Sequence, residues 1–418
     1  PDKTEDLNYF YPTSVMETGH DILFFWVARM IMMGIRNTGE IPFKTIYLHG
    51  LVRDPEGIKM SKTKGNVMDP LKLIDTYGAD ALRFALTMGL AAGNDNRLNE
   101  NKMQFGRNFA NKLWNASRFV ISNAINQNEY IPTKQIDINH IHDKWVLSLL
   151  NKLIIDFDNH MEGFQFSEAQ QEVYEYFWDQ YCDWYLEMSK LRIKSGDLSC
   201  IPILILVLDR ILRLLHPFMP FITEEIWQTL KKEIGGSEFD DDALIIAEFP
   251  NGDKHLIDDD AESIMDSVIE IIRAVRNLRA ELHIAPNISL EIQIESELID
   301  HISKQFVIVE QLANVRIGNN NLRMSLDQDD SNQLVSIVLD KSILTISVKD
   351  YIDVVVEIDR LTQELDSINQ RIKSVAKRLV DSKFLNNAPS EIVDKETEKH
   401  RISKDRSEKL AKLLAQLK

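Results

Sequence analysis

The sequence is poor in cysteine, and this scarcity excludes several kinds of protein. Only Cys182 and Cys200 occur among 418 residues, and they form no C-x-x-C pair. We therefore expect no disulfide framework and no protein-bound zinc or other metal site, and a reducing, cytoplasmic compartment. Long uncharged apolar runs are also missing, because Asp209 and two arginines interrupt the hydrophobic stretch 200–222. That stretch predicts a buried helix, and we expect no membrane partner.

An excess of basic residues is also lacking. The net charge is −17, which argues against a general nucleic-acid coat but leaves room for a local basic surface. The chain is too long for one hydrophobic core, so its length suggests about two to four domains. We expect a multidomain α/β plus all-α protein, with boundaries near residues 96, 245 and 349.

Residues 1–96 predict part of an α/β layer. The stretch 20–34 is typical of a buried helix ending at Gly34, and 44–52 is typical of a buried strand. A further helix should begin with Asp69 as N-cap and Pro70 at its first position.

Three further segments follow. Residues 97–245 predict a helical bundle, in which Ser167 and Gln170 should form a capping box. Residues 246–349 alternate like strands after one helix and predict a small α/β module. Residues 350–418 predict an antiparallel coiled-coil hairpin, broken at 386–389. Its seam spaces apolar residues by three and four, at Ile358, Leu361, Leu365, Ile368, Ile372, Val375 and Leu379.

A lysine-rich loop, "GIKMSKTKGN" at 57–66, separates the predicted strand from the helix at Pro70. Lysine ammonium groups suit phosphate oxygens, and nucleotidyl transfer needs positive charge near the α-phosphate and the departing pyrophosphate. Lys59, Ser61 and Lys62 could supply it, while Gly57 and Gly65 would allow the loop to close and reopen. No Walker A motif occurs. From spacing alone, a solvated lysine-rich turn remains the simpler interpretation.

The loop "KMSKT" is one residue from the KMSKS signature of class I aminoacyl-tRNA synthetases. The stretches "ETGHDILFFWVARMIMMG", "HGLVRDPEGIKMSKTKGNVMDPLKLIDTYGADALRFAL", "GRNFANKLWNASRFV" and "KFLNNAPSEIVDKE" closely resemble the valyl-tRNA synthetase family. The resemblance covers essentially the whole chain. It implies the second half of a Rossmann-like catalytic domain, then a helical anticodon-binding domain, a small α/β module and a coiled-coil arm that binds tRNA.

The resemblance also implies residue roles. Lys62 matches the lysine that contacts ATP and stabilises the transition state, with Lys59 and Ser61 in support. Thr63 replaces the usual last serine and keeps a hydroxyl. Glu17 and Asp21 match positions that hold the ribose of the adenylate. Trp26 matches a position that lines the amino-acid pocket. From the residues alone, Glu17 and Asp21 could equally cap a helix, and Trp26 reads better as core.

The arm's phosphate contacts should be electrostatic and sensitive to salt. A solvated coiled-coil face is an equally good interpretation of its basic residues. The candidates are Arg371, Lys373, Lys377, Arg378 and Lys383.

By this resemblance the parent protein would be a valine–tRNA ligase, using ATP with Mg²⁺, valine and tRNA(Val) as a cytoplasmic monomer. No HIGH-type sequence occurs in the chain, and no inserted editing domain either. We therefore expect a C-terminal portion that is inactive alone. Isoleucyl- and leucyl-type synthetases share the loop but do not typically end in this hairpin. A non-catalytic tRNA-binding protein would not need the lysines, and a coiled-coil scaffold would leave the first 350 residues unexplained.

Overall fold

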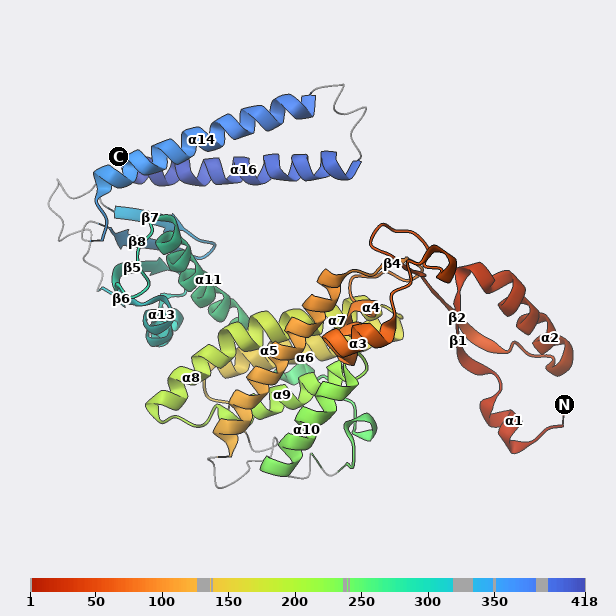
Figure 1. The fold of residues 1–418 in the computed structure, drawn as a ribbon. Helices are drawn as coiled ribbons and strands as arrows, with labels where there is room; N and C mark the ends of the chain where they lie inside the picture. The colour runs from red at the N-terminus through yellow and green to blue at the C-terminus, as the bar shows by residue number, and fades with distance from the viewer. Residues whose placement is uncertain are drawn as a thin grey trace. The chain divides into compact units, whose positions relative to one another are not determined.

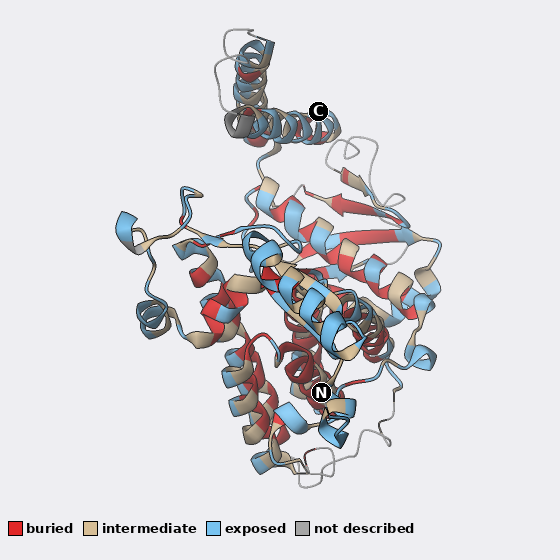
Figure 2. Ribbon diagram, turned by 90° about the vertical axis from the view of Figure 1, so that its right-hand side faces the viewer, coloured by how far each residue is buried: buried red, intermediate tan, exposed pale blue. Residues whose placement is uncertain are grey.

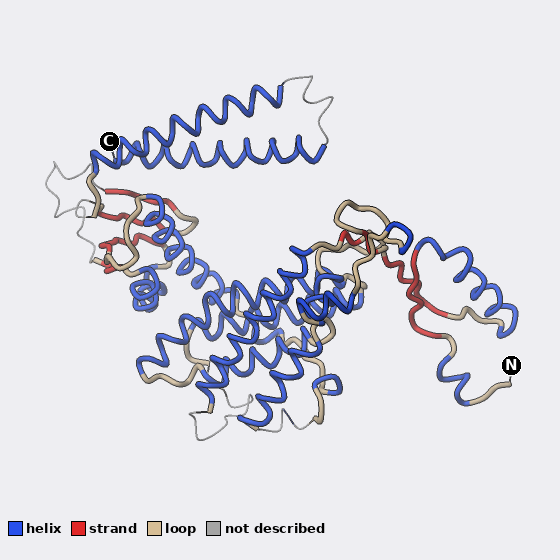
Figure 3. Tube along the Cα trace, in the orientation of Figure 1, coloured by secondary structure: helices blue, strands red, loops and turns tan. Residues whose placement is uncertain are grey.

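The computed structural model describes residues 2–125, 136, 138–235, 239, 241–318, 334–348, 351–380 and 390–417. It divides into two compact units, Pro1–Ala261 and Glu262–Lys418, which are described separately. The described residues are mostly helical, and their strands form small sheets (Figures 1 and 3).

The first unit begins with a parallel strand pair. After helix α1 (Glu5–Phe10), strand β1 (Thr13–Gly19) pairs in parallel with β2 (Phe43–His49), and Glu17 lies opposite Tyr47. The connection consists of a 3₁₀ turn (His20–Ile22), a π-helical turn (Leu23–Val27) and helix α2 (Ala28–Thr38). This strand–helix–strand unit brings the carboxyl ends of both strands to one edge.

The predicted helix end at Gly34 is wrong, because α2 continues to Thr38. Gly39 ends the helix in the left-handed region, with φ of 79°, and its N–H donates to the carbonyl of Ile35. Gly34 serves close packing instead. A Cβ there would lie 2.9 Å from the Tyr11 hydroxyl and 3.1 Å from the Pro42 ring.

The expected burial of this segment is also wrong. The side chains of Phe24, Phe25 and Met32 are 75%, 63% and 62% exposed, whereas Val27 is fully buried. Apart from Arg29, residues 22–33 are all apolar, a composition typical of a buried helix. Within the described residues, however, much of that apolar surface lies open to solvent (Figure 2).

The lysine loop lies, in sequence, between the two strands of a second small pair. Strand β3 (Val52–Arg53) pairs in parallel with β4 (Asn96–Arg97), and helices α3 (Pro70–Tyr77) and α4 (Ala79–Thr87) lie between them in sequence. Asp69 caps α3 and Pro70 begins it, as predicted. Gly50 permits a very close approach of two chain segments, because a Cβ there would meet the Asn94 carbonyl oxygen at 1.7 Å.

The described residues between 100 and 234 are mostly helical, as the sequence predicted. Of the apolar helix predicted at 200–222, residues 201–215 form α9, which is buried along almost its whole length, and a turn and the start of α10 follow. Its charged residues are satisfied internally: Asp209 accepts from Arg213 at 2.9 Å and from the Trp227 indole at 3.0 Å. The elements are α5 (Glu100–Ala124), α6 (Ile141–Glu162), α7 (Phe166–Glu175), a π-helical stretch (Tyr176–Tyr185), α8 (Leu186–Ser195), α9 (Ile201–Leu215) and α10 (Pro220–Ile234).

The predicted capping box is absent. Helix α7 begins at Phe166 without a side-chain cap, and Ser167 and Gln170 both lie within it. The Ser167 hydroxyl instead accepts from the backbone N–H groups of Gly89 and Leu90, at 2.9 and 3.1 Å. Ser167 and Gln170 have the spacing of a capping box, but Ser167 uses its hydroxyl to bind a segment distant in the sequence.

The second unit contains a four-stranded sheet in the order β6-β5-β8-β7. Strands β5 and β6 pair in parallel and the other neighbours are antiparallel. The sequence predicted these strands from their alternating pattern. Its elements are α11 (Asp259–Glu281, of which the first three residues belong to the first unit), β5 (Leu290–Ser296), α12 (Ile299–Ile302), α13 (Phe306–Ala313), β6 (Val315–Ile317), β7 (Leu334–Val338) and β8 (Ser342–Ser347), with a short 3₁₀ turn at Ser303–Gln305. Two other short 3₁₀ turns, Leu244–Ile246 and Lys254–Leu256, lie in the first unit.

Two long helices end the chain and pack side by side (Figure 1): α14 (Val354–Val380) and α16 (Ser390–Leu417). In the expected seam Leu361 and Val375 are buried. The predicted break at 386–389 lies outside the described residues. No helix in the described part of the chain is long and apolar enough to cross a membrane.

Candidate functional site

The lysine loop turns tightly at its glycines. Gly57 has φ of +80° and Gly65 of +70°, a region that residues with side chains rarely adopt. Between them the Ser61 and Thr63 hydroxyls lie 2.8 Å apart, and the Lys64 N–H donates to the Ser61 carbonyl at 3.1 Å. The hydroxyls of Ser61 and Thr63 are therefore hydrogen-bonded to each other within the loop.

Two of the predicted site residues meet directly. Lys59 Nζ lies 3.4 Å from Asp21 Oδ2, which joins the lysine loop to the turn after β1. Both side chains are about half exposed, so this ion pair contributes less than about 1 kcal/mol and leaves Lys59 free to move to a ligand. Lys62 begins the 3₁₀ turn Lys62–Lys64, and its side chain lies outside the described part.

Glu17 lies on the same strand end but faces a different neighbour. Its carboxylate is 3.7 Å from His49 Nε2 at the end of β2. Burial raises the pKa of the neighbouring Tyr47, and the Glu17 charge raises it further. Trp26 is 54% exposed, so its interpretation as core is wrong among the described residues, and it remains open to a ligand or another segment.

Beside Glu17 lies a cavity of about 450 Å³ that sequence reasoning missed. Its wall includes His49, Phe164 from the turn between α6 and α7, and Phe166, the first residue of α7. Both rings pack against Tyr47, with centroids 5.8 and 5.4 Å away. Phe164 has φ of +58°, so the turn holds its ring there in a rarely adopted backbone conformation.

Helix α4, which follows the lysine loop, is bonded to the helical segment. The buried Asp80 accepts from the N–H groups of Phe221 and Ile222, at 3.2 and 2.7 Å, at the start of α10. Burial raises the pKa of Asp80 above its usual value. Arg83 donates to the Pro217 carbonyl at 2.9 Å, at the end of α9. A negative side chain thus faces a helix N-terminus and a positive one faces a C-terminus, as the helix dipoles favour.

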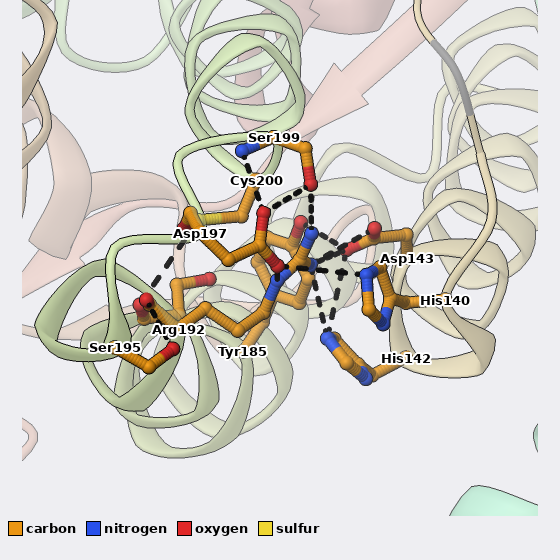
Figure 4. Close-up of polar contacts among 10 residues, drawn as sticks. His140, His142, Asp143, Tyr185, Arg192, Ser195, Asp197, Ser199 and Cys200 are labelled. Carbon is orange, nitrogen blue, oxygen red and sulfur yellow. Dashed lines mark hydrogen bonds and ion pairs between the residues drawn. The ribbon is translucent and has the colours of Figure 1, made fainter.

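A second polar group lies inside the helical segment (Figure 4). Arg192 on α8 donates to both oxygens of the fully buried Asp143 on α6, at 2.7 and 2.9 Å. It also donates to Asp197 at 2.7 Å and to Ser199 at 2.6 Å, while the Tyr185 hydroxyl donates to Asp143 at 2.7 Å. These bonds connect the start of α6, the end of α8 and the turn before α9.

The arm candidates fall into two groups. Arg371, Lys373 and Lys377 on α14 are exposed. Arg378 instead reaches across to Glu396 on α16, at 3.3 Å. Lys383 lies outside the described residues. We find no group of three or more potential metal ligands within the part of the chain that the structure describes.

Comparison with known families matches three parts of the chain. Residues 1–99 match class I tRNA synthetases (I, L, M and V), residues 143–294 match the anticodon-binding domain of tRNA ligase, and residues 353–418 match the valyl-tRNA synthetase tRNA-binding arm. The chain belongs to the class I tRNA synthetase family.

Within that class, the resemblance to valyl-tRNA synthetases is confirmed. The valine–tRNA ligase of Dehalococcoides mccartyi (strain ATCC BAA-2266) is 44% identical over 401 residues, which is 96% of this chain and 45% of that protein. That of Clostridium acetobutylicum is 41% identical over 424 residues, with 100% and 47% covered. The chain thus spans about half the length of these curated relatives.

Two solved synthetase structures align with parts of the chain. Agrobacterium radiobacter K84 LeuRS, in a ternary complex with tRNA and LeuAMS, aligns with a TM-score of 0.47 and 21% identity over 60% of this chain and 30% of that one. Mycobacterium tuberculosis methionyl-tRNA synthetase with methionyl-adenylate aligns with a TM-score of 0.46 and 22% identity, covering 54% and 46%.

Proposed function

We propose that the chain is the C-terminal part of a valine–tRNA ligase, which activates valine with Mg-ATP and transfers it to tRNA(Val). The observation that carries this proposal is the meeting of Lys59 with Asp21, 3.4 Å apart, at the carboxyl edge of the parallel strands β1 and β2. In open α/β sheets, ligands bind at that edge. The curated relatives named valine–tRNA ligase support the choice of amino acid.

In this proposal the loop acts on the nucleotide. Lys62, supported by Lys59 and Ser61, would stabilise the charge that develops as pyrophosphate leaves, because ammonium groups aimed at a developing charge lower the barrier. Glu17 and Asp21 would accept hydrogen bonds from the adenylate ribose, and Trp26 would line the valine side-chain pocket. Magnesium would enter with ATP as part of the substrate.

The remaining segments would bind tRNA. Residues 97–245 would form the anticodon-binding bundle, after a catalytic part at 1–96. The module at 246–349 would carry a coiled-coil arm at 350–418, with α14 and α16 as its two helices. The exposed Arg371, Lys373 and Lys377 would contact phosphates of the tRNA elbow, and the whole protein would act as a cytoplasmic monomer.

Valine-dependent ATP–pyrophosphate exchange by the full-length protein tests the proposal. We expect Lys62→Ala to lower kcat by about 100- to 1,000-fold, as when a preorganised charge stabiliser is removed. The matched control Lys72→Ala, an exposed lysine on α3, should leave the rate unchanged. The 418-residue chain alone should show no exchange, because it has no HIGH-type sequence.

Two results would contradict the proposal. One is a full-length protein that exchanges pyrophosphate with isoleucine or leucine but not with valine. The other is a protein that binds tRNA yet exchanges with no amino acid, which would favour a non-catalytic tRNA-binding role.

A further inference from the structure

The two ends of the lysine loop meet at one buried carboxylate. Asp54 follows β3 directly and is 5% exposed. Its Oδ1 accepts from the Ile58 N–H at 2.7 Å, and its own backbone N–H donates to the Ile58 carbonyl at 3.0 Å. Its Oδ2 accepts from the side-chain amide of Asn66, at 2.7 Å. Asp54 thus holds the loop where the chain enters it.

Asn66 continues the same network from the other end of the loop. Its Oδ1 accepts from the Ser61 N–H at 2.9 Å, and its Nδ2 lies 3.4 Å from the Lys59 carbonyl. The backbone on both sides of Met60 is therefore fixed by one side chain. Met60 itself packs against the apolar cluster of Leu82 and its neighbours.

In this pair the charged carboxylate of Asp54 accepts a hydrogen bond from the neutral side-chain amide of Asn66. The hydrogen bond from Asn66 is the largest influence on Asp54 and holds the pKa of its carboxyl below the usual value, although burial opposes this. A charged acceptor with two donors makes stronger bonds than a neutral one. Each bond of the network therefore joins a donor to an acceptor: the Ile58 N–H and the Asn66 amide donate to Asp54, and the Ser61 N–H donates to the Asn66 carbonyl oxygen.

The cationic side chain at the top of the loop is held much less firmly. Among the described residues, Lys59 forms one ion pair, with the exposed side chain of Asp21. A loop whose backbone is fixed and whose ammonium groups are mobile can reorient those groups toward phosphates without refolding. The positions that the ammonium groups can reach then depend on the fixed backbone, and a misplacement of about 1 Å can lower a rate by about 100-fold.

We propose that Asp54 and Asn66 form a clip that positions the lysine loop for the transfer step. They act through Lys59, Ser61 and the loop backbone, so they are positioning residues. This inference rests on the proposed function, because the transfer step is the one described above.

The test uses ATP–pyrophosphate exchange by the full-length protein. In Asp54→Asn, the new side-chain amide at position 54 adds a donor to the Ile58 N–H and the Asn66 side-chain amide, and too few acceptors remain. In Asn66→Asp, two carboxylates are placed in contact. We expect each single substitution to lower kcat by about 10- to 100-fold, with KM for ATP changed by less than about threefold.

Exchanging the two side chains gives the most decisive test of the proposal. In the double variant Asp54→Asn/Asn66→Asp, the carboxamide at position 54 can still accept from the Ile58 N–H and donate to the carboxylate at 66. That carboxylate can still accept from the Ser61 N–H. We expect the double variant to recover kcat by at least about tenfold over the weaker single variant.

The matched control is Asp69→Asn, which lies three residues beyond the clip. Asp69 caps α3 by accepting from the Leu71 N–H at 3.0 Å, and asparagine caps equally well. We expect this control to retain the unsubstituted rate. A double variant as slow as the singles, or a control that is equally slow, would overturn the clip.

Amide hydrogen exchange of residues 58–66 in the same proteins separates failure of the clip from failure of the proposed function. We expect faster exchange in each single variant and recovery in the double variant, whatever reaction the protein catalyses. Unchanged exchange in the singles would overturn the clip. Absent valine-dependent activity in the unsubstituted protein would overturn only the proposed function.

Discussion

Replacing Arg192 with alanine should be among the most destabilising single changes in the helical segment. Arg192 is 8% exposed, and its guanidinium lies within hydrogen-bond distance of four side chains (Figure 4). It donates to Asp143 at 2.7 and 2.9 Å, to Asp197 at 2.7 Å and to Ser199 at 2.6 Å, and lies 3.0 Å from His142 Nε2. Arg192→Ala would remove all of these contacts at once.

The size of the loss follows from Asp143. This carboxylate is fully buried, and burial already raises its pKa even with Arg192 present. Removing one partner of a buried ion pair leaves an uncompensated charge and costs about 3–5 kcal/mol of unfolding free energy. Arg192→Lys should cost less, about 1–3 kcal/mol, because one ammonium cannot span the same acceptors in a planar fork.

Equilibrium urea unfolding measures this loss, followed by tryptophan fluorescence because Trp145 and Trp184 lie in the same segment. Lys190→Ala is the matched control on α8. Its ion pair with Glu187 is exposed, so we expect a loss below about 1 kcal/mol. The double variant Arg192→Met/Asp143→Leu should lose less than the sum of its own single variants, Arg192→Met and Asp143→Leu, since neither charge is left alone in the double variant.

Two results would refute this reasoning. A loss below about 1 kcal/mol for Arg192→Ala would mean that water or protonation relieves Asp143 at little cost. Strict additivity in the double variant would mean that the two residues act independently, despite their 2.7 Å contact.

Two further predictions concern charge. Burial raises the pKa of Asp197, but hydrogen bonds from Ser199 and Arg192 outweigh it and leave the pKa well below its usual value. The stability that Asp197 contributes is therefore present above about pH 4 and is lost as the pH falls further, so the unfolding free energies of the native chain and of Asp197→Asn should converge in acid. In the arm, Lys373→Glu with Lys377→Glu should lower tRNA affinity and reduce the slope of log K against log salt by about two. Arg378→Ala should affect that slope less, because Glu396 already engages its charge, and an equal change in slope would contradict this division.

Local patterns in the sequence predicted the elements well. Asp69 and Pro70 marked the start of α3, and alternating residues marked the four strands between Leu290 and Ser347. Such signals depend on neighbours within a few residues, and hydrogen bonds over that range act in the same way in most folds. The lysine loop was located for the same reason, from a contiguous motif.

Predictions failed where a residue's partner lies far away in the chain. Gly34 looked like a helix end but makes room for Tyr11 and Pro42, and Gly39 ends the helix instead. Ser167 looked like a cap but accepts from the backbone at Gly89. A single sequence shows which groups can form bonds, but not which of several distant partners they meet.

The sequence by itself determined the family and the order of the helices and strands, and it located the lysine loop, because these depend on residue types in short fixed spacings. Only the tertiary structure decided that Asp54 meets Asn66, that Arg192 meets Asp143, and that α4 is bonded to the helical segment. Those pairings depend on how distant backbone segments pack. Burial then makes it costly to remove one partner of such a pair and leave the other charge unpaired.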